Sequence, residues 1–303
     1  MKQCVWSLVL LSLVGGVSTT AIANERFEIK VSRDIEFARV DDFSLKLDLY
    51  KPVGAASPPL IVWVHGGAWR AGSKDSMPLH ELVSRRFAIA SVDYRLSPVA
   101  KFPAQVHDCK AAIRFLRAKA KHYGYDASKI GVAGSSAGGH LVAEIGVTNG
   151  HPKLEGTVGK HLDQSSSVQA IVDYYGPTNF LTILKQSTPH GLSVRVPALQ
   201  LLLGCQPEEN AALAKLASPV FHVDRNDPPL LMIHGDADPQ VPINQSHELH
   251  GRYKQLGLPA QLEVIHGGAH GGPEFYDQAR IDLVDQFLTA HLRDARAGGK
   301  STN

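Results

Sequence analysis

IGVAGSSAGGHLVAEI, residues 130–145, joins a short apolar run to a helical pattern through a serine flanked by glycines. Ile130–Ala133 predicts a strand, and Leu141–Ile145 predicts a helix that follows almost at once. So short a reversal forces the central residue, Ser136, into a strained backbone, and glycines two positions to either side remove side chains that would collide. The pattern predicts a serine hydroxyl beside the N-terminus of a helix, where the helix dipole favours negative charge.

Two simpler interpretations of this stretch stay open. The motif G-x-S-x-G at 134–138 also arises by chance, and a glycine-rich turn without chemistry would have the same sequence. Ser135 offers a second hydroxyl, but it stands one residue too early for the flanking glycines, so we expect it to be structural. A serine also needs a base, and the base needs an orienting acid, before it becomes a nucleophile.

Short continuous apolar runs appear from Leu60 onward, as is typical of strands buried on both faces of a sheet. They are Leu60–Val64, Phe87–Val92, Lys129–Ala133, Val168–Val172, Pro229–Ile233 and Gln261–Ile265. Helical patterns lie between them, at Ala104–Tyr123 and near 76–86, 137–147, 243–256 and 275–293. Strands that alternate with helices predict an α/β fold, with a mostly parallel central sheet and helices on both faces.

Two segments depart from this alternation. Residues 27–50 alternate apolar and polar side chains around Asp41-Asp42, which predicts an antiparallel hairpin at an edge of the sheet. Residues 178–217 mix helix and loop signals, and we expect a cap-like insertion over the edge formed by the carboxyl ends of the strands. Since no repeat or interdomain linker interrupts the pattern, residues 24–295 are expected to form one domain.

The N-terminus carries the pattern of a secretory signal peptide. A positive charge precedes the short apolar core Leu8–Val14, and Ala21-Ile22-Ala23 places small residues where a signal peptidase cleaves. We expect residues 1–23 to be removed and the mature protein to be secreted or periplasmic. An uncleaved membrane anchor is the alternative, although the apolar core is short for a bilayer span. The polar residues 296–303 are expected to be a frayed tail.

Composition disfavours several classes of function. A formal net charge of +2 over 303 residues provides no strong field that would recruit nucleic acid. The fifteen histidines do not combine with carboxylates or cysteines at recognised ligand spacing, so no metal site is expected. Cys109 and Cys205 are expected to be unpaired, largely inert thiols rather than a disulfide.

Two carboxylates follow the strand predicted at 229–233. HGDADPQVP occupies residues 234–242, with Asp236 and Asp238 two positions apart. Asp238 is the preferred acid because it follows the turn and is fixed by Pro239, whereas Asp236 is expected to tie the loop backbone together. The opposite assignment stays open.

The base is expected after the next strand. HGGAHGG, residues 266–272, has His266 at the end of the strand and His270 among small residues. We prefer His270, because a loop of small residues can reach the serine, and expect His266 to be structural; the exchange of these roles stays open. Serine, acid and base then follow separate strands, at the edge where open α/β sheets bind ligands.

Backbone amides for an oxyanion hole are expected in HGGAW, residues 65–69, which follows the first buried strand. Paired glycines let the backbone approach a substrate oxygen closely, and the residue after the nucleophile supplies a further amide. We expect Gly66 to shape the turn and His65 to order the loop rather than act as a base. The expected oxyanion-hole residues are Gly66, Gly67, Ala68 and Ala137.

Six blocks of the sequence resemble a known family: VWVHGGAWRAGSK, VDYRLSP, FPAQVHDCKAAIRFLR, GVAGSSAGGHL, PPLLMIHGDADPQVP and GGAHGG. They are similar to the bifunctional acetylxylan and feruloyl esterase branch of the α/β-hydrolases, which is related to the hormone-sensitive-lipase-like carboxylesterases. The resemblance implies an α/β-hydrolase fold and a structural role for Asp93-Tyr94-Arg95. It implies an oxyanion hole at His65-Gly66-Gly67, and as catalytic triad it implies Ser136, Asp238 and His270.

One position departs from the pattern of this family. Ala68 stands where lipase-like members often carry a third glycine. Because alanine still has a backbone N–H, the oxyanion hole survives the difference, whereas any substrate preference tied to the extra glycine does not carry over.

These features predict an exported serine carboxylic-ester hydrolase that acts through an acyl-enzyme without metal or organic cofactor. Its expected substrates are acetyl or feruloyl esters of plant polysaccharide, or small short-chain esters. We expect no nucleic-acid partner and no stable membrane insertion after the signal peptide is removed. A general lipase-like carboxylesterase or a serine peptidase on the same fold is the alternative, and a non-catalytic binding protein that kept the fold is a more remote one.

Overall fold

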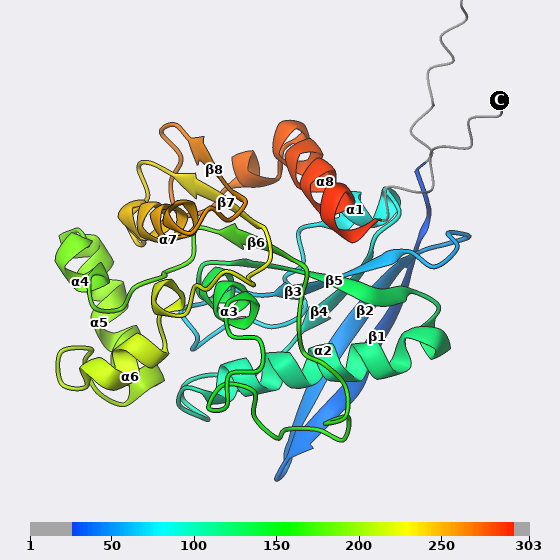
Figure 1. Cartoon of the computed structure of the whole chain (residues 1–303), viewed down its shortest axis with the longest axis horizontal. Helices are drawn as coiled ribbons and strands as arrows, with labels where there is room; N and C mark the ends of the chain where they lie inside the picture. Colours follow the sequence, from blue (N-terminus) through cyan, green and yellow to red (C-terminus); the bar gives the residue numbers. More distant parts are fainter. Residues whose placement is uncertain (1–25, 294–303) are drawn as a thin grey trace, which may run out of the picture.

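An eight-stranded sheet with helices on both faces organises the computed structural model (Figure 1). The structure describes residues 26–293. The predicted signal peptide at 1–23, the predicted tail at 296–303 and the predicted domain limits 24 and 295 lie outside the described residues. Within 26–293, no helix combines the length and the apolar character needed to cross a bilayer.

The sheet has the strand order β1-β2-β4-β3-β5-β6-β7-β8. Its strands are β1 (Ile29–Val40), β2 (Phe43–Pro52), β3 (Pro59–Val64), β4 (Ala88–Val92), β5 (Asp126–Ser135), β6 (Ala170–Tyr174), β7 (Leu230–Gly235) and β8 (Ala260–Ile265). Strands β3 to β8 run parallel, and β2 joins them antiparallel to β4. The predicted fold class, a mostly parallel α/β sheet, is confirmed.

The predicted edge hairpin is present. β1 and β2 pair antiparallel, and the turn between them lies at Asp41-Asp42. Leu45, Leu47 and Leu49, at alternate positions of β2, are buried in the core, while β1 is the outer strand of the sheet. Most side chains of β1 stay at least partly exposed, as expected of an edge strand, whereas Asp48 and Tyr50 on the other face of β2 are buried as well.

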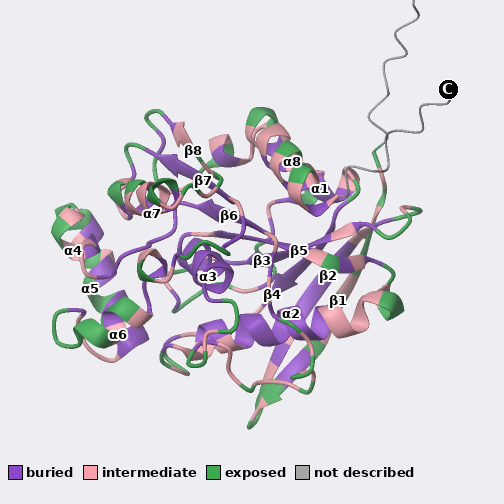
Figure 2. Cartoon of the chain, viewed as in Figure 1, coloured by how far each residue is buried: buried purple, intermediate pink, exposed green. Residues whose placement is uncertain are grey.

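The central strands fill two cores at once. In β3, Leu60, Val62 and Val64 belong to one buried cluster, and Ile61 and Trp63 belong to the other. Successive residues of a strand point to opposite faces of the sheet. An unbroken apolar run therefore packs against helices on both sides, and Figure 2 shows these strands buried along their length.

Five helices cover the two faces of the sheet. Helices α2 (Ala104–Tyr123), α3 (Ala137–Gly146) and α7 (Asn244–Gln255) pack into the cluster that contains Leu60. Helices α1 (His80–Ser84) and α8 (Gln278–Leu292) pack into the cluster that contains Ile61. All ten residues of α3 are buried, so the helix that follows the serine is fixed by its surroundings along its whole length.

One strand lies farther along the chain than predicted. β6 spans Ala170–Tyr174, whereas the apolar run predicted Val168–Val172. Asp173 ends that run, yet it is buried inside the strand and its Oδ1 accepts a hydrogen bond from the backbone N–H of Gly176. A carboxylate with a backbone donor is tolerated in a sheet interior, and the apolar pattern does not reveal the donor.

Two helices are shorter than predicted. The helix expected near 275–293 is divided into a 3-10 turn, Pro273–Tyr276, and α8. The cause is Asp277, whose side chain accepts a hydrogen bond from the N–H of Arg280 and so caps a new helix start. The helix expected near 76–86 is reduced to α1.

Residues 178–217 contain α4 (Ile183–Gln186), α5 (Pro189–Leu203) and α6 (Ala211–Leu216), which lie together beside α7 in Figure 1. The segment begins on α7, because Gln245 Oε1 accepts hydrogen bonds from the backbone N–H groups of Thr178 and Asn179. At the start of α5, Thr188 Oγ1 donates to Pro239 O in the loop after β7, at 2.9 Å. The insertion therefore contacts the edge formed by the carboxyl ends of the parallel strands.

Candidate active site

Ser136 stands on the turn between β5, which ends at Ser135, and α3, which begins at Ala137. Its φ is +54°, a value that residues with a side chain rarely adopt. Two backbone hydrogen bonds fix this conformation: Ser136 N–H donates to Tyr174 O at 2.8 Å, and Ser136 O accepts from His140 N–H at 3.0 Å. The strained strand-to-helix turn expected from the sequence is present.

The glycines on either side of the serine are required by close packing. A Cβ atom on Gly138 would lie 2.0 Å from Val64 O, and a Cβ atom on Gly134 would lie 2.5 Å from Gly138 O. Real Cβ atoms do not approach a backbone oxygen so closely. These two positions accept only glycine unless the neighbouring strand or turn moves.

The structure brings Ser136, Asp238 and His270 into one chain of hydrogen bonds. His270 Nε2 lies 2.8 Å from Ser136 Oγ, and His270 Nδ1 lies 2.6 Å from Asp238 Oδ2. Ser136 follows β5, Asp238 follows β7 and His270 follows β8, so three separate loops meet at one edge of the sheet. Because the carboxylate can only accept, Nδ1 carries the proton and Nε2 is left to accept from the serine hydroxyl.

The carboxylate of Asp238 is held from several sides. Its Oδ1 accepts hydrogen bonds from the backbone N–H groups of Gln240 and Val241, at 2.7 and 2.9 Å. Its Oδ2 lies 3.3 Å from Nε2 of the buried His234 in addition to its bond with His270. Burial alone would raise the pKa of Asp238, but the hydrogen bonds from His234 and His270 outweigh burial and lower the pKa. Asp238 is therefore ionised, as an orienting acid must be.

The second aspartate and the second histidine form a separate pair. His266 Nδ1 lies 2.8 Å from Asp236 Oδ2, and Asp236 Oδ1 accepts a hydrogen bond from Gly267 N–H at 2.7 Å. The side chain of His266 is 87% exposed. Asp236 and His266 thus tie two surface loops together, and neither has a contact with Ser136.

The HGGAW loop lies directly against the serine. A Cβ atom on Gly66 would lie 2.9 Å from Ser135 O and 3.3 Å from Ser136 Cβ, so only glycine lets the loop approach this closely. Gly67 and Ala68 both have positive φ, +106° and +51°, so the backbone of the loop turns sharply at these two residues. Of the four expected oxyanion-hole residues, Gly66 lies against Ser136 and Ala137 follows it directly in the chain, while Gly67 and Ala68 continue the same loop.

Three backbone donors at this point are available to a ligand. Within residues 26–293, no group accepts a hydrogen bond from the N–H of Gly67, Ala68 or Ala137. The loop is closed behind them, because Gly67 O accepts from the N–H groups of Arg70 and Ala71. Free amides at a helix N-terminus and in a tight loop are suited to stabilising an oxyanion.

Residues 47–253 match the model of a known protein family, BD-FAE. The chain belongs to the BD-FAE family. The match covers more than half of the chain and includes the HGGAW loop, the serine turn and the loop that carries Asp238. The suspected family is therefore confirmed.

Individual relatives agree with this membership. The esterase LipC of Mycobacterium tuberculosis is 31% identical over 83% of this chain and 62% of its own length. An arylesterase of Saccharolobus solfataricus is 36% identical over 82% of this chain and 80% of its own. The chain spans between half and two thirds of the length of the first curated relatives that it matches.

A solved carbohydrate esterase from gut microbiota has the same fold as this BD-FAE chain. The two share 34% sequence identity with a TM-score of 0.77, over 88% of this chain and 98% of the other. The α/β-hydrolase fold is thereby confirmed. The relatives are named esterases, which agrees with the predicted enzyme class, a carboxylic-ester hydrolase.

The block Asp93-Tyr94-Arg95, which the resemblance marked as structural, holds the base of the HGGAW loop. Tyr94 OH donates to His65 O at 3.1 Å, and the two aromatic rings stack 4.4 Å apart. Arg95 binds the buried carboxylate of Asp108 through Nε and Nη2, at 2.8 and 2.7 Å. The Nδ1 of His65 in turn donates to Gly66 O at 2.7 Å, so His65 orders the loop as expected.

A buried histidine joins the oxyanion loop to the serine helix. Trp69 Nε1 donates to His140 Nδ1 at 3.1 Å, and His140 Nε2 donates to Ala217 O of the insertion at 2.9 Å. Phe180 completes the packing, with its ring stacked on that of His140 at 4.9 Å. The position of His140, one turn after the nucleophile in α3, links the turn, the loop and the insertion in one buried cluster.

Two side chains at the triad were not predicted from the sequence. The ring of Tyr175 lies 4.8 Å from that of His270, and Tyr175 has a φ of +47°. His234 supports the carboxylate of Asp238 from behind. The signal for Tyr175 was its place directly after β6, at the edge where ligand sites form. Nothing in the sequence separates His234 from an ordinary core histidine.

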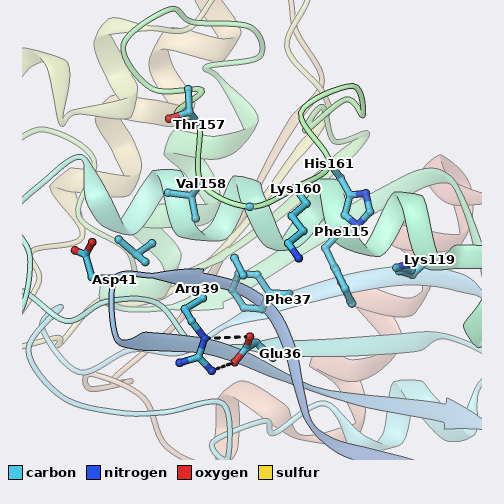
Figure 3. Close-up of a pocket in the computed structure, with 13 residues that line it drawn as sticks. Glu36, Phe37, Arg39, Asp41, Phe115, Lys119, Thr157, Val158, Lys160 and His161 are labelled. Carbon is cyan, nitrogen blue, oxygen red and sulfur yellow. Dashed lines mark hydrogen bonds and ion pairs between the residues drawn. The ribbon is translucent and has the colours of Figure 1, made fainter.

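A cavity of about 870 Å³ lies away from the triad, between β1, α2 and the loop 157–161. Figure 3 shows residues that line it, among them Phe37, Phe115 and the Arg39–Glu36 ion pair. No residue of the triad lines it. The candidate active site is therefore defined by hydrogen bonds and free amides rather than by cavity size.

The remaining expectations concern cysteines and metals. Cys109 and Cys205 are both unpaired, as expected, and burial raises the pKa of Cys109 well above its usual value, so that thiol is inert. Over the described range 26–293, no group of three or more His, Cys, Asp or Glu side chains is arranged to hold a metal ion.

We predict that the contribution of His65 and His140 to stability falls as the solution is acidified from about pH 6.5 to pH 4, against an opposite contribution from buried carboxyls with raised pKa, such as Asp173 and Asp227. Burial lowers the pKa of His65 and of His140 to about 4, while the unfolded chain binds these protons near pH 6.5. Across this interval these two histidines are protonated more in the unfolded state than in the folded state, so their contribution to the free energy of unfolding decreases with falling pH. Urea unfolding at several pH values measures this dependence.

The variant His65→Asn isolates one of the two histidines, because asparagine keeps a donor for Gly66 O but does not titrate. It should flatten the pH dependence by up to about 1.4 kcal/mol per pH unit. Buried carboxyls such as Asp173 contribute equally to the pH dependence of the wild type and of His65→Asn, so their contribution cancels when the two are compared. An unchanged slope would show that His65 takes up its proton in the folded state as readily as in the unfolded state.

Proposed function

We propose that this chain is a serine carboxylic-ester hydrolase, with Ser136 as nucleophile, His270 as general base and Asp238 as orienting acid. The observation that carries the proposal is the unbroken chain of hydrogen bonds from Asp238 through His270 to Ser136, at the end of a strained turn. The esterases among its relatives support the same reaction class.

In the first half of the reaction His270 Nε2 accepts the hydroxyl proton as Ser136 Oγ attacks the ester carbonyl carbon. The distance of 2.8 Å between these atoms is suited to direct proton transfer. The ionised Asp238 stabilises the imidazolium that forms. When the tetrahedral intermediate collapses, the proton passes from His270 to the departing alcohol and the acyl group stays on the serine.

The oxyanion of each tetrahedral intermediate is bound by the amides of Gly67, Ala68 and Ala137. They have no other acceptor within the described part of the chain, so no existing bond has to break when the charge develops. In the second half of the reaction His270 takes a proton from water, the resulting hydroxide attacks the acyl-enzyme, and the carboxylic acid leaves as Ser136 regains its proton.

As substrates we propose acetyl or feruloyl esters of plant polysaccharide, together with small short-chain esters. The similarity to a carbohydrate esterase at 34% identity supports this class. We further propose that the protein is exported, to the periplasm or the medium. The charge, apolar core and small residues of 1–23 support export, because they form the pattern of a signal peptide. The proposed substrate agrees with export, since polysaccharide is encountered outside the cytoplasm.

We predict that Ser136→Ala keeps the fold and lowers kcat by at least about 10⁴-fold. Alanine tolerates the same backbone as serine and removes the hydroxyl that lies 2.8 Å from His270 Nε2. Circular dichroism checks the fold, and 4-nitrophenyl acetate reports turnover. A fluorophosphonate probe should label the wild type at Ser136 and leave the variant unlabelled. A folded variant with full activity would contradict the nucleophile assignment, and an unlabelled wild type would favour a non-catalytic protein.

The substrate class is decided by a panel of esters. We expect the wild type to release acetate from acetylated xylan or ferulate from feruloylated arabinoxylan, and Ser136→Ala to release neither. Chromatography of the free acids measures both products. If the wild type hydrolyses only the nitrophenyl ester, the protein is a general carboxylesterase rather than a polysaccharide esterase.

We expect Asp238→Asn to lower kcat by roughly 10³- to 10⁴-fold, because an amide favours the wrong tautomer of His270. Asp236→Asn is the matched control: the same substitution two residues away, in a carboxylate that pairs with the exposed His266. It should change kcat by less than about threefold. Equal effects of the two substitutions, or a larger effect at Asp236, would exclude Asp238 as the orienting acid.

A further inference from the structure

Arg195, on α5 of the insertion, is a buried cation beside the triad. The residue is 1% exposed, and its Cζ lies 5.7 Å from the centre of the Trp69 ring. Trp69 directly follows Ala68 in the HGGAW loop. The guanidinium is therefore packed against the loop that carries two of the three free amides.

The start of the same helix lies on the loop of the catalytic acid. Thr188 Oγ1 donates to Pro239 O, and a Cβ atom on Gly191 would lie 3.0 Å from the same oxygen. Arg195 follows Gly191 by one helical turn. The side chain thus extends from a helix that begins on the acid loop to Trp69 of the oxyanion loop.

Electrostatic coupling agrees with this position. The pKa of Arg195 is lowered to about 10, mainly by burial. The negative charge of Asp238 opposes this shift, and the positive charge of Arg70 adds to it. The charge of Arg195 also contributes to the lowered pKa of His140, on the serine helix. Arg195 therefore remains charged at neutral pH and lies close to the acid loop, the oxyanion loop and the serine helix.

No group of the described chain accepts a hydrogen bond from the guanidinium of Arg195. Nε and Nη1 of Arg195 are buried without a hydrogen-bond partner. Asp238 is occupied, because Oδ1 accepts from two backbone amides and Oδ2 from His270 and His234. A buried guanidinium without an acceptor opposes folding, so its presence is explained best by a ligand that brings the acceptor.

We propose that Arg195 is an anion-binding subsite and that the favoured substrates of this chain are esters that carry a carboxylate. The planar guanidinium offers parallel N–H donors that match the two oxygens of a carboxylate, whereas a neutral carbonyl would leave the charge uncompensated. This inference rests on the proposed esterase function and narrows its substrate class. The carboxylate belongs either to the acyl group or to the alcohol.

The test compares acids with their neutral methyl esters. For an acyl-side carboxylate the pair is mono-4-nitrophenyl glutarate and its methyl ester; for an alcohol-side carboxylate it is 4-acetoxybenzoate and its methyl ester. We expect wild-type kcat/KM to favour the acid in one pair, by about tenfold or more, and that pair identifies the side on which the carboxylate sits.

Arg195→Met keeps the length of the side chain and removes the charge and the donors. It should lower kcat/KM for the favoured acid by roughly 10- to 100-fold while changing its methyl ester by less than about threefold. Lys185→Met is the control, because it removes an exposed positive charge from α4 of the same insertion. It should leave the ratio of acid to methyl ester unchanged.

Two outcomes would overturn the proposal. One is a wild type that hydrolyses acids and methyl esters equally well. The other is an equal loss on both kinds of ester in Arg195→Met, as expected of a merely structural residue. If that variant fails to fold, Arg195→Lys and inhibition of the wild type by glutarate, compared with dimethyl glutarate, decide the question; equal inhibition by the two compounds contradicts the subsite.

Failure of the esterase function itself gives a different result. In that case the wild type hydrolyses none of the esters and Ser136 is not labelled by the fluorophosphonate. Calorimetry with glutarate then still tests the subsite: binding to the wild type and not to Arg195→Met supports it, and absence of binding to both contradicts it. Turnover of the methyl esters without any preference for the acids contradicts only the subsite.

Discussion

The positive φ of Ser136 is the constraint around which this end of the molecule is packed. Such a conformation costs on the order of 1–3 kcal/mol and persists only where the surroundings hold it. Here β6 accepts the N–H of Ser136, α3 starts from its carbonyl, and α3 is buried throughout. Gly138 lies so close to Val64 O of β3 that no side chain fits between helix and sheet. The strained conformation is therefore held by buried central strands and by a buried helix.

The surroundings give two aspartates of the same loop different electrostatic properties. Asp236 and Asp238 lie on one loop, but Asp238 is buried among two backbone amides and two histidines while Asp236 faces solvent. Hydrogen bonds to the ionised form outweigh the cost of burial at Asp238, which keeps its charge and fixes the tautomer of His270. The exposed pair at Asp236 is weakened by water and serves only to join two loops.

The insertion adds a different kind of group to the same edge of the sheet. Most buried polar groups around the triad have partners: His140 bridges Trp69 and Ala217, and His65 is held by Tyr94 and Gly66. Arg195 does not, and an unpaired buried cation lowers stability. On the function proposed above, catalysis belongs to the loops of the sheet and selection of the substrate to Arg195 on α5.

Local pattern was enough to indicate the strands, apart from the limits of β6, and the serine turn. Apolar runs report burial on both faces, and glycines at 134 and 138 report a backbone that tolerates no side chain, so both signals are contained in neighbouring residues. Tertiary structure decided what depends on distant partners. The choice between His266 and His270, the support from His234 and the isolation of Arg195 each arise from side chains that only folding brings together. Burial and hydrogen bonding are properties of the surroundings, which the sequence of a single segment does not contain.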